Sequence, residues 1–362
     1  MLRPFLGFLA LTVAASVFQA AWIVSLAVFV SERYPLLSGG AAASWMIASS
    51  YLASVFSSTL DARRSLPWGL ALMALGMMTL GMWSPRAGIM GCVLVPLGLG
   101  LARASQLTLV SGLSQLEPSR AFSIYNAAIN LAYLSGGVAA NYFRARLGWD
   151  GLWLISAVVI GLSSLGSLFV APVPRSAPSG TPSPWNPLAM VVILLVVTTY
   201  FFVAAQFQTV LALLVEQECP QIRSGGLGAA HGLGVLVFSV VQSVFRGGKG
   251  SSTALAVGLL SIAGSFALLA STGRLDSVQV FVAVGLVSVG ETVVGANMQA
   301  LGSRLAGLGR SAYWLAALVG YALSGAASMV WQPALRQAYL LTVAGLCLLS
   351  GVVALLGLNR DR

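Results

Sequence analysis

The sequence predicts an all-α membrane protein with twelve transmembrane helices in two similar six-helix bundles. Of its 362 residues, 58% are hydrophobic and 8% are charged, and the mean hydropathy is +0.90. A soluble domain carries about a quarter charged residues, so a soluble fold of this composition would lack a polar surface. The apolar residues form repeated runs of about the 20 residues that a membrane helix needs. A proline-rich segment divides these runs into two equal sets.

Charged residues, prolines and glycine clusters interrupt the runs and set the expected helix limits. In the first half we expect helices at residues 5–30, 40–60, 66–83, 87–115, 121–142 and 151–171. In the second half we expect helices at residues 188–216, 225–245, 252–271, 277–303, 311–330 and 335–357. The first run has no small-residue cleavage site and is longer than the core of a signal peptide, so we interpret it as a membrane helix.

Residues 172–187 hold six of the chain's 14 prolines and cannot be helical. We therefore expect a bundle at 1–171, a cytoplasmic linker at 172–187 and a second bundle at 188–362. A weak internal repeat supports two halves, because Ser119 to Ala132 aligns without gaps on a segment 190 residues later, Gly309 to Ala322. Parallel six-helix repeats of this kind place a substrate site between the halves, near the membrane midplane.

The basic residues predict the topology and exclude some function classes. Eleven would lie in the cytoplasm if both termini did, against seven outside, which favours cytoplasmic termini in a bacterial inner membrane. The net charge of +10 is scattered singly between apolar runs and forms no stripe, so nucleic acid is not an expected partner. Cys92, Cys219 and Cys347 are far apart and predict neither a disulfide framework nor a metal site. We expect no cofactor.

Two ionisable residues lie in the middle of expected helices. Arg103 is within 87–115 and Glu291 is within 277–303. Because charge inside a membrane is costly, such residues are functional candidates. A guanidinium binds carboxylates through paired hydrogen bonds, so this cation and this anion could grip the two ends of a zwitterion. The alternative is that each pairs with a polar neighbour and fixes helix packing.

The remaining polar candidates are a histidine, some amides and a loop. His231 lies in the glycine-rich stretch from Gly225 to Gly234, where it is either a hydrogen-bonded packing residue or a cavity imidazole that titrates near neutral pH. Amides within membrane helices commonly join neighbouring helices; those here are Asn130, Gln206, Gln208, Asn297 and Gln299. Asp61-Ala-Arg63-Arg64 follows the expected second helix, where it could simply anchor the membrane interface.

That loop is similar to the Gly-x-x-x-Asp-Arg-x-Gly-Arg-Arg loop of major facilitator transporters, of which Asp61, Arg63 and Arg64 remain. The segment that follows resembles one branch of those transporters, the proton-coupled oligopeptide transporter family. Gly98-Leu-Gly-Leu-Ala-Arg103 is similar to its Gly-x-Gly-Leu-x-Lys segment. Phe122 to Ala132 resembles its Phe-x-x-x-Tyr-x-x-Ile-Asn-x-Gly signature, and Gly148-Trp149 matches the Gly-Trp that follows.

In the second half, Gln206 fits the glutamine of the family's Glu-Gln pair, His231 falls at the asparagine of its Asn-Pro, and Glu291 fits its glutamate. The resemblance implies that Asn130, His231 and Glu291 hold a substrate amine while Arg103 faces the carboxylate. We predict that these four residues and Gln206 bind the substrate.

Two departures concern proton coupling. The family's first helix carries Glu-x-x-Glu-Arg-Phe-x-Tyr-Tyr, whereas residues 14–22 here contain no ionisable group, and Ala205 replaces the glutamate of the Glu-Gln pair. Neither proton drive nor peptide specificity is therefore expected to be inherited, and we predict transport that does not depend on the proton gradient.

The leading hypothesis is a secondary transporter that moves a small zwitterionic or peptide-like solute by alternating access. The missing charges of the first helix favour an alternative, the export of a hydrophobic or metallophore-like compound. A third hypothesis is a non-transporting subunit that binds a protein partner in a membrane complex. An enzyme is not expected, because one histidine and scattered acids cannot assemble a catalytic set.

Overall fold

The computed structural model describes residues 2–34, 38–57, 60–82, 84–111, 118–169, 187–245, 252–304 and 308–358, and their regular structure is entirely helical. The first bundle contains α1 (Leu2–Arg33), α2 (Gly39–Ser57), α3 (Ala62–Leu80), α4 (Pro85–Ser111) and α5 (Pro118–Ser167). The second bundle contains α6 (Pro187–Gln206), η1 (Phe207–Leu211), α7 (Ala212–Glu218), α8 (Arg223–Phe245), α9 (Ser252–Ala270), α10 (Ser277–Arg304), α11 (Leu308–Met329), η2 (Pro333–Leu335) and α12 (Arg336–Leu358).

These elements make twelve spans in the described part of the chain, as the sequence predicts. Gly148 interrupts α5 with φ 69° and ψ −171°, a backbone conformation that glycine adopts without strain, so that α5 comprises two spans. The π-helical turn η1 joins α6 to α7 in one further span. The helix expected at 66–83 begins earlier, at Ala62, because the Asp61 carboxylate caps it by accepting a hydrogen bond from the Arg63 backbone N–H at 3.1 Å.

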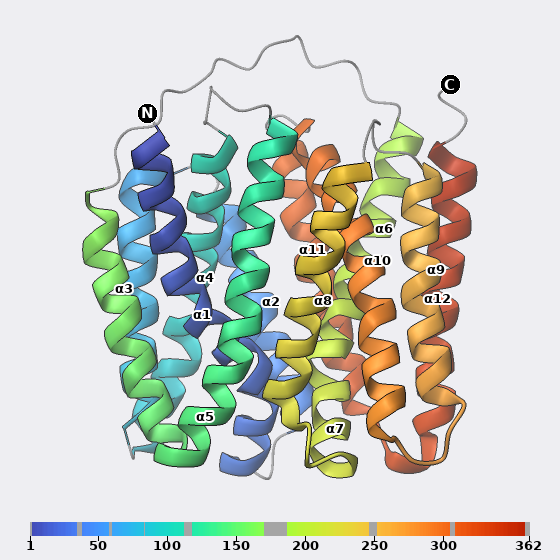
Figure 1. Cartoon of the computed structure of the whole chain (residues 1–362), viewed down its shortest axis with the longest axis horizontal. Helices are drawn as coiled ribbons and strands as arrows, with labels where there is room; N and C mark the ends of the chain where they lie inside the picture. The colour runs from blue at the N-terminus through green and yellow to red at the C-terminus, as the bar shows by residue number, and fades with distance from the viewer. Residues whose placement is uncertain are drawn as a thin grey trace.

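The two bundles stand side by side, and both chain termini lie at the same end of the molecule (Figure 1). We call this the termini end and the opposite one the far end. One apolar core is built from the second bundle alone. The other belongs mainly to the first bundle and includes a few residues of the second, such as Trp314 and Tyr321. The helices in closest contact across the interface are α5 with α8 and α2 with α11. The predicted linker, 172–187, lies outside the described residues except for Pro187, and the domain limits stay a prediction.

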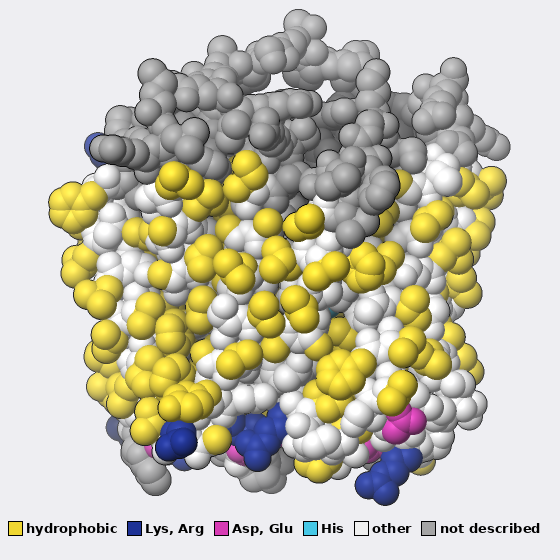
Figure 2. Space-filling model, viewed as in Figure 1, with side chains coloured by type: hydrophobic (Ala, Val, Ile, Leu, Met, Phe, Trp, Pro, Cys, Tyr) yellow, Lys and Arg dark blue, Asp and Glu magenta, His cyan; other side chains and the backbone are white. Residues whose placement is uncertain are grey.

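The outer surface fits a lipid environment. Hydrophobic side chains spread over the face that the helices present to the viewer, while Lys, Arg, Asp and Glu gather at the far end (Figure 2). Eight helical segments of the described chain are long and apolar enough to cross a membrane, and one of them, Ile124–Ser167, holds both spans of α5. The chain is a multi-pass membrane protein.

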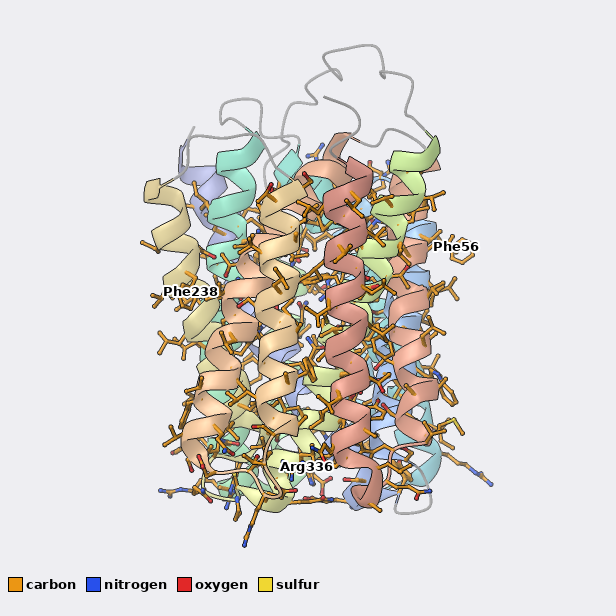
Figure 3. The ribbon with its side chains drawn as sticks, turned by 90° about the vertical axis from the view of Figure 1, so that its right-hand side faces the viewer. Phe56, Phe238 and Arg336 are labelled. Atoms are coloured by element: carbon orange, nitrogen blue, oxygen red, sulfur yellow. The ribbon has the colours of Figure 1, made fainter. Side chains whose placement is uncertain are left out.

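A buried ion pair fastens the far end of the second bundle. Arg336, at the start of α12, lies among the lower parts of the helices in Figure 3 and is 8% exposed. Its Nη1 donates to both carboxylate oxygens of Glu218, at 3.0 and 2.9 Å, and to the Gly273 carbonyl at 3.0 Å. Its Nη2 donates to the Leu269 carbonyl at 3.3 Å. The arginine thus joins α12 to the end of α7 and to the connection between α9 and α10.

Candidate functional site

A cavity of about 270 Å³ lies between the bundles. The first bundle lines it with residues of α1, α2, α4 and α5, and the second with residues of α6, η1, α8, α10 and α11. Four of the five predicted binding residues are in its wall: Arg103, Asn130, His231 and Glu291. Concave sites with a few convergent polar groups are where small molecules usually bind.

Arg103 lies in the middle of α4 and faces this cavity, as expected for a charge that would be costly in lipid. Its guanidinium carbon is 5.1 Å from the centroid of the Tyr51 ring, a cation–π contact with α2. Among the ion pairs formed by the described residues, none involves Arg103. Its charge is therefore available to a solute.

Two glutamine amides share the first-bundle wall with Arg103. Gln106 is one helical turn further along α4, and its Oε1 accepts a hydrogen bond from the Tyr125 hydroxyl at 3.1 Å. Gln19 of α1 accepts from the Ser16 hydroxyl at 3.5 Å. The Nε2 atoms of both amides are buried and have no hydrogen-bond partner within the described structure. Both Nε2 atoms are covered by neighbouring groups and are not part of the cavity surface.

The second bundle contributes an ion pair. Nε2 of His231, on α8, lies 2.8 Å from Oε2 of Glu291, on α10. Nδ1 of the same imidazole lies 3.2 Å from the Ser288 hydroxyl, one turn before Glu291, and the Phe207 ring packs 4.8 Å from the imidazole. Glu291 still lines the cavity, with 32% of its side chain exposed. It is therefore accessible to a solute but already has a partner in its own bundle.

The two predicted amides differ in position. Asn130 lines the cavity and donates to the Asn126 carbonyl on its own helix at 2.8 Å. Gln206 is not part of the lining. Gln208 is, and it accepts a hydrogen bond from the Tyr321 hydroxyl at 2.8 Å. Residues two apart on a helix point to opposite sides, and the π-helical turn begins between these two glutamines.

Gln206 instead supports the contact between the bundles. It is 1% exposed, donates to the Ser324 hydroxyl at 2.8 Å and accepts from the Tyr339 hydroxyl at 2.6 Å. Ser324 in turn lies 3.3 Å, hydroxyl to hydroxyl, from Ser44 on α2. This polar chain joins α12, α6, α11 and α2, which fits the interhelical role that amides often have in membranes.

Aromatic side chains cover much of the cavity surface, a feature that the sequence analysis did not single out. We call the following set the aromatic wall: Tyr51, Tyr125, Tyr133, Tyr200, Phe201, Tyr313, Trp314 and Tyr321. Its rings contact one another, for instance Tyr51 with Tyr321 at 5.1 Å and with Phe201 at 5.2 Å between centroids. Six of the chain's nine tyrosines belong to this wall, so polar hydroxyls inside apolar runs were the signal that could have found it.

At the far end a charged network ties the bundles together. Arg144, on α5, donates from Nη1 to Glu216 of α7 at 2.8 Å and from Nη2 to Glu32 of α1. The Trp149 indole N–H donates to the other oxygen of Glu32 at 2.7 Å, and the Ser224 backbone N–H donates to Glu216 at 2.9 Å. From the sequence, Arg144 is only one of the seven basic residues counted outside the cytoplasm. Its tertiary position makes it a link between the two bundles.

Glycines allow α5 and α8 to approach closely near the same end. A Cβ at Gly137 would overlap the backbone of Gly225 and Ala229, and one at Gly232 would overlap the backbone of Leu134. The glycine-rich stretch around His231 therefore serves helix packing across the interface.

The remaining predicted motif is separate from the cavity. Asp61, Arg63 and Arg64 line a separate hollow of about 280 Å³ beside Leu109 and Ser167. The hollow lies where α3 begins, and the Asp61 side chain already caps that helix. None of the three residues lines the main cavity.

Comparison with known proteins identifies the family. A sequence profile described as Major Facilitator Superfamily matches residues 1–329. The chain belongs to the major facilitator superfamily. No curated protein sequence matches it.

Solved structures share the fold of this facilitator at low sequence identity. One is a POT family transporter in complex with 5-aminolevulinic acid, with a TM-score of 0.84, 12% identity, and coverage of 99% of this chain and 97% of that chain. Another comes from work on substrate recognition in proton dependent oligopeptide transporters, with a TM-score of 0.82, 15% identity and full coverage of both chains. A third is the peptide transporter POT in complex with sulfate, with a TM-score of 0.80, 15% identity, and coverage of 99% and 94%. At such identities the likeness shows the fold alone.

Family membership and fold together make this protein a secondary membrane transporter of small solutes, embedded in a lipid bilayer, and not an enzyme. The predicted facilitator fold of two six-helix bundles is confirmed.

Proposed function

We propose that this facilitator moves a small organic solute with a carboxylate or similar acid group by alternating access. The observation that carries the proposal is the position of Arg103, which faces a cavity between the bundles and has no acidic partner among the described residues. A guanidinium in such a place binds an acid group strongly, because both are removed from water. Zwitterionic and peptide-like solutes, which the sequence predicts, belong to this class.

The far end supports the alternating part of the proposal. Arg144, Glu32 and Glu216 join α5, α1 and α7, so the bundles are closed there. The cavity lining extends toward the termini end, since it includes Thr108 near the end of α4 and Tyr125 near the start of α5. With cytoplasmic termini in a bacterial inner membrane, as the count of basic residues favours, this conformation closes the periplasmic side.

The other functions considered from the sequence have less support. A non-transporting subunit would have no need for an unpaired charge in an interior cavity, and a carrier of purely hydrophobic compounds would have no need for Arg103. The uncharged α1 wall, with Ser16, Gln19 and Ile23, does fit a solute with an apolar body.

The test uses spin labels at Leu147→Cys and Gln217→Cys, two exposed positions near the far end of different bundles. Cys92, Cys219 and Cys347 are first replaced by serine or alanine. In liposomes we expect two distance populations, one short for the closed far end and one longer for the open far end. A single short distance, with or without added carboxylic acids, contradicts alternating access. A filter assay of carboxylate uptake into the same liposomes, compared with Arg103→Gln, tests the choice of solute.

A further inference from the structure

The protons of the His231–Glu291 pair can be assigned from its third member. Ser288 Oγ has one proton and lies 2.8 Å from the Val284 carbonyl and 3.3 Å from the His231 carbonyl, so it is assigned as a donor to these carbonyls and as the acceptor at its contact with Nδ1 of His231. Nδ1 therefore carries a hydrogen. A second proton lies between Nε2 and Oε2, because at 2.8 Å one of these atoms must donate to the other. Wherever that proton is, the pair as a whole is neutral.

This assignment fixes the charge of the cavity. The other ionisable groups of the lining are the tyrosines of α2, α5, α6 and α11, which are neutral near pH 7, and Arg103 of α4. The described lining residues of α1 and α8 add no charge besides His231. Arg103 is consequently the one uncompensated charge of the described lining, and the net charge is +1. A zwitterion adds no net charge and would leave the +1 uncompensated, whereas a monoanion balances the site.

The aromatic wall indicates the body of the solute. It adds ring faces and edges from both bundles to the cavity that Arg103 faces. Aromatic pairs attract each other beyond the area they bury, so a ring is favoured over a saturated body of similar size.

We infer that the cavity is selective for an organic monoanion with an aromatic body and no free amine, whose acid group lies at Arg103. The inference narrows the proposed function to a substrate class and rests on it for transport, although it concerns equilibrium binding and can be tested without transport.

The experiment measures binding to the purified full chain at pH 7 by isothermal calorimetry. The probes are four compounds with one skeleton: 3-phenylpropionate, L-phenylalanine, 2-phenylethylamine and 3-cyclohexylpropionate. We expect 3-phenylpropionate to bind at least tenfold tighter than L-phenylalanine and about threefold tighter than 3-cyclohexylpropionate, and we expect no binding of the amine. Equal or tighter binding of L-phenylalanine overturns the inference, and so does the absence of binding by all four compounds. This comparison needs no variant, so it stands even where a variant fails to fold.

Variants then locate the acid group. Arg103→Gln should lower affinity for 3-phenylpropionate at least tenfold, whereas Arg146→Gln, which changes an exposed arginine near the far end, should leave affinity unchanged. His231→Gln removes the partner of Glu291 and leaves the cavity neutral overall, with separate charges. In that variant the preference for 3-phenylpropionate over L-phenylalanine should fall at least tenfold. Unchanged affinity in Arg103→Gln, or unchanged preference in folded His231→Gln, overturns the inference.

The two proposals fail separately. If 3-phenylpropionate binds selectively but only one far-end spin-label distance is found, alternating access is contradicted and the proposed substrate class is supported. If two distance populations are found but L-phenylalanine binds preferentially, alternating access is supported and the proposed substrate class is contradicted.

Discussion

His231 and Glu291 form an ion pair of 2.8 Å within one bundle, joining α8 to α10. Because both helices belong to the second bundle, a rocking motion between bundles does not separate the two side chains. Arg144 and Glu216, at 2.8 Å, lie on opposite sides of the interface and must separate when the far end opens. The first pair thus stays together when the bundles rock, and the second opposes a change of state.

We expect solute uptake to be independent of the proton gradient. Proton coupling requires a group whose protonation changes between the two states, and the His231–Glu291 pair keeps its geometry in both. The α1 wall adds no acid, and Ala205 is an apolar residue with no exposed surface. Uptake into proteoliposomes with an inward proton gradient should equal uptake without one at equal membrane potential. Accumulation that a protonophore abolishes would contradict this, and its loss in His231→Ala would assign the coupling to the histidine.

Arg144→Gln should open the far end. The substitution removes hydrogen bonds to Glu32 and Glu216, and charged hydrogen bonds contribute about 1.5–3 kcal/mol each when buried. These side chains are partly exposed, so we expect a modest effect. The equilibrium between the closed and the open far end should shift by about 1 kcal/mol, or roughly fivefold, toward the open state. Spin-label distances between positions 147 and 217 measure it. Arg146→Gln is the matched control, and equal distance distributions in the two variants would show that the network does not hold the bundles together.

Gly137→Ala should disfavour the same closed state for a steric reason. Its Cβ would overlap the backbone of Gly225 and Ala229, so α5 and α8 must move apart. We expect a lower unfolding temperature and a larger open population. Gly345→Ala on α12 is the control, because a Cβ there meets no atom within 4 Å. A Gly137→Ala protein that matches this control in both measurements would contradict the close packing of α5 and α8.

Arg336→Met should destabilise the second bundle. The change leaves Glu218 partly buried with only the Leu275 backbone N–H, at 2.7 Å, among its described donors. Breaking a buried pair by removing one partner costs about 3–5 kcal/mol. Heat unfolding in detergent, followed by tryptophan fluorescence, should show a clearly lower unfolding temperature, which is a loss of stability. The control is Arg274→Met, an exposed arginine nearby; a comparable loss in the control would assign the effect to general changes in charge.

The general architecture follows from the sequence because it depends on local composition. The length of apolar runs and the proline-rich break are sufficient to predict two sets of six spans. The cavity positions of Arg103 and Glu291 were also predictable, since a charge in the middle of a span is unfavourable in lipid.

The tertiary structure decided which groups meet. Helices that are apolar on all sides carry little periodic signal, so their sequence does not say which side faces the cavity. The sequence therefore favoured Gln206 over Gln208 by resemblance alone, whereas packing places Gln208 in the cavity wall and Gln206 outside it. The contacts of Arg144 with Glu32 and Glu216, and of His231 with Glu291, join residues 60 or more positions apart. Such contacts depend on how whole helices pack, which no local pattern records.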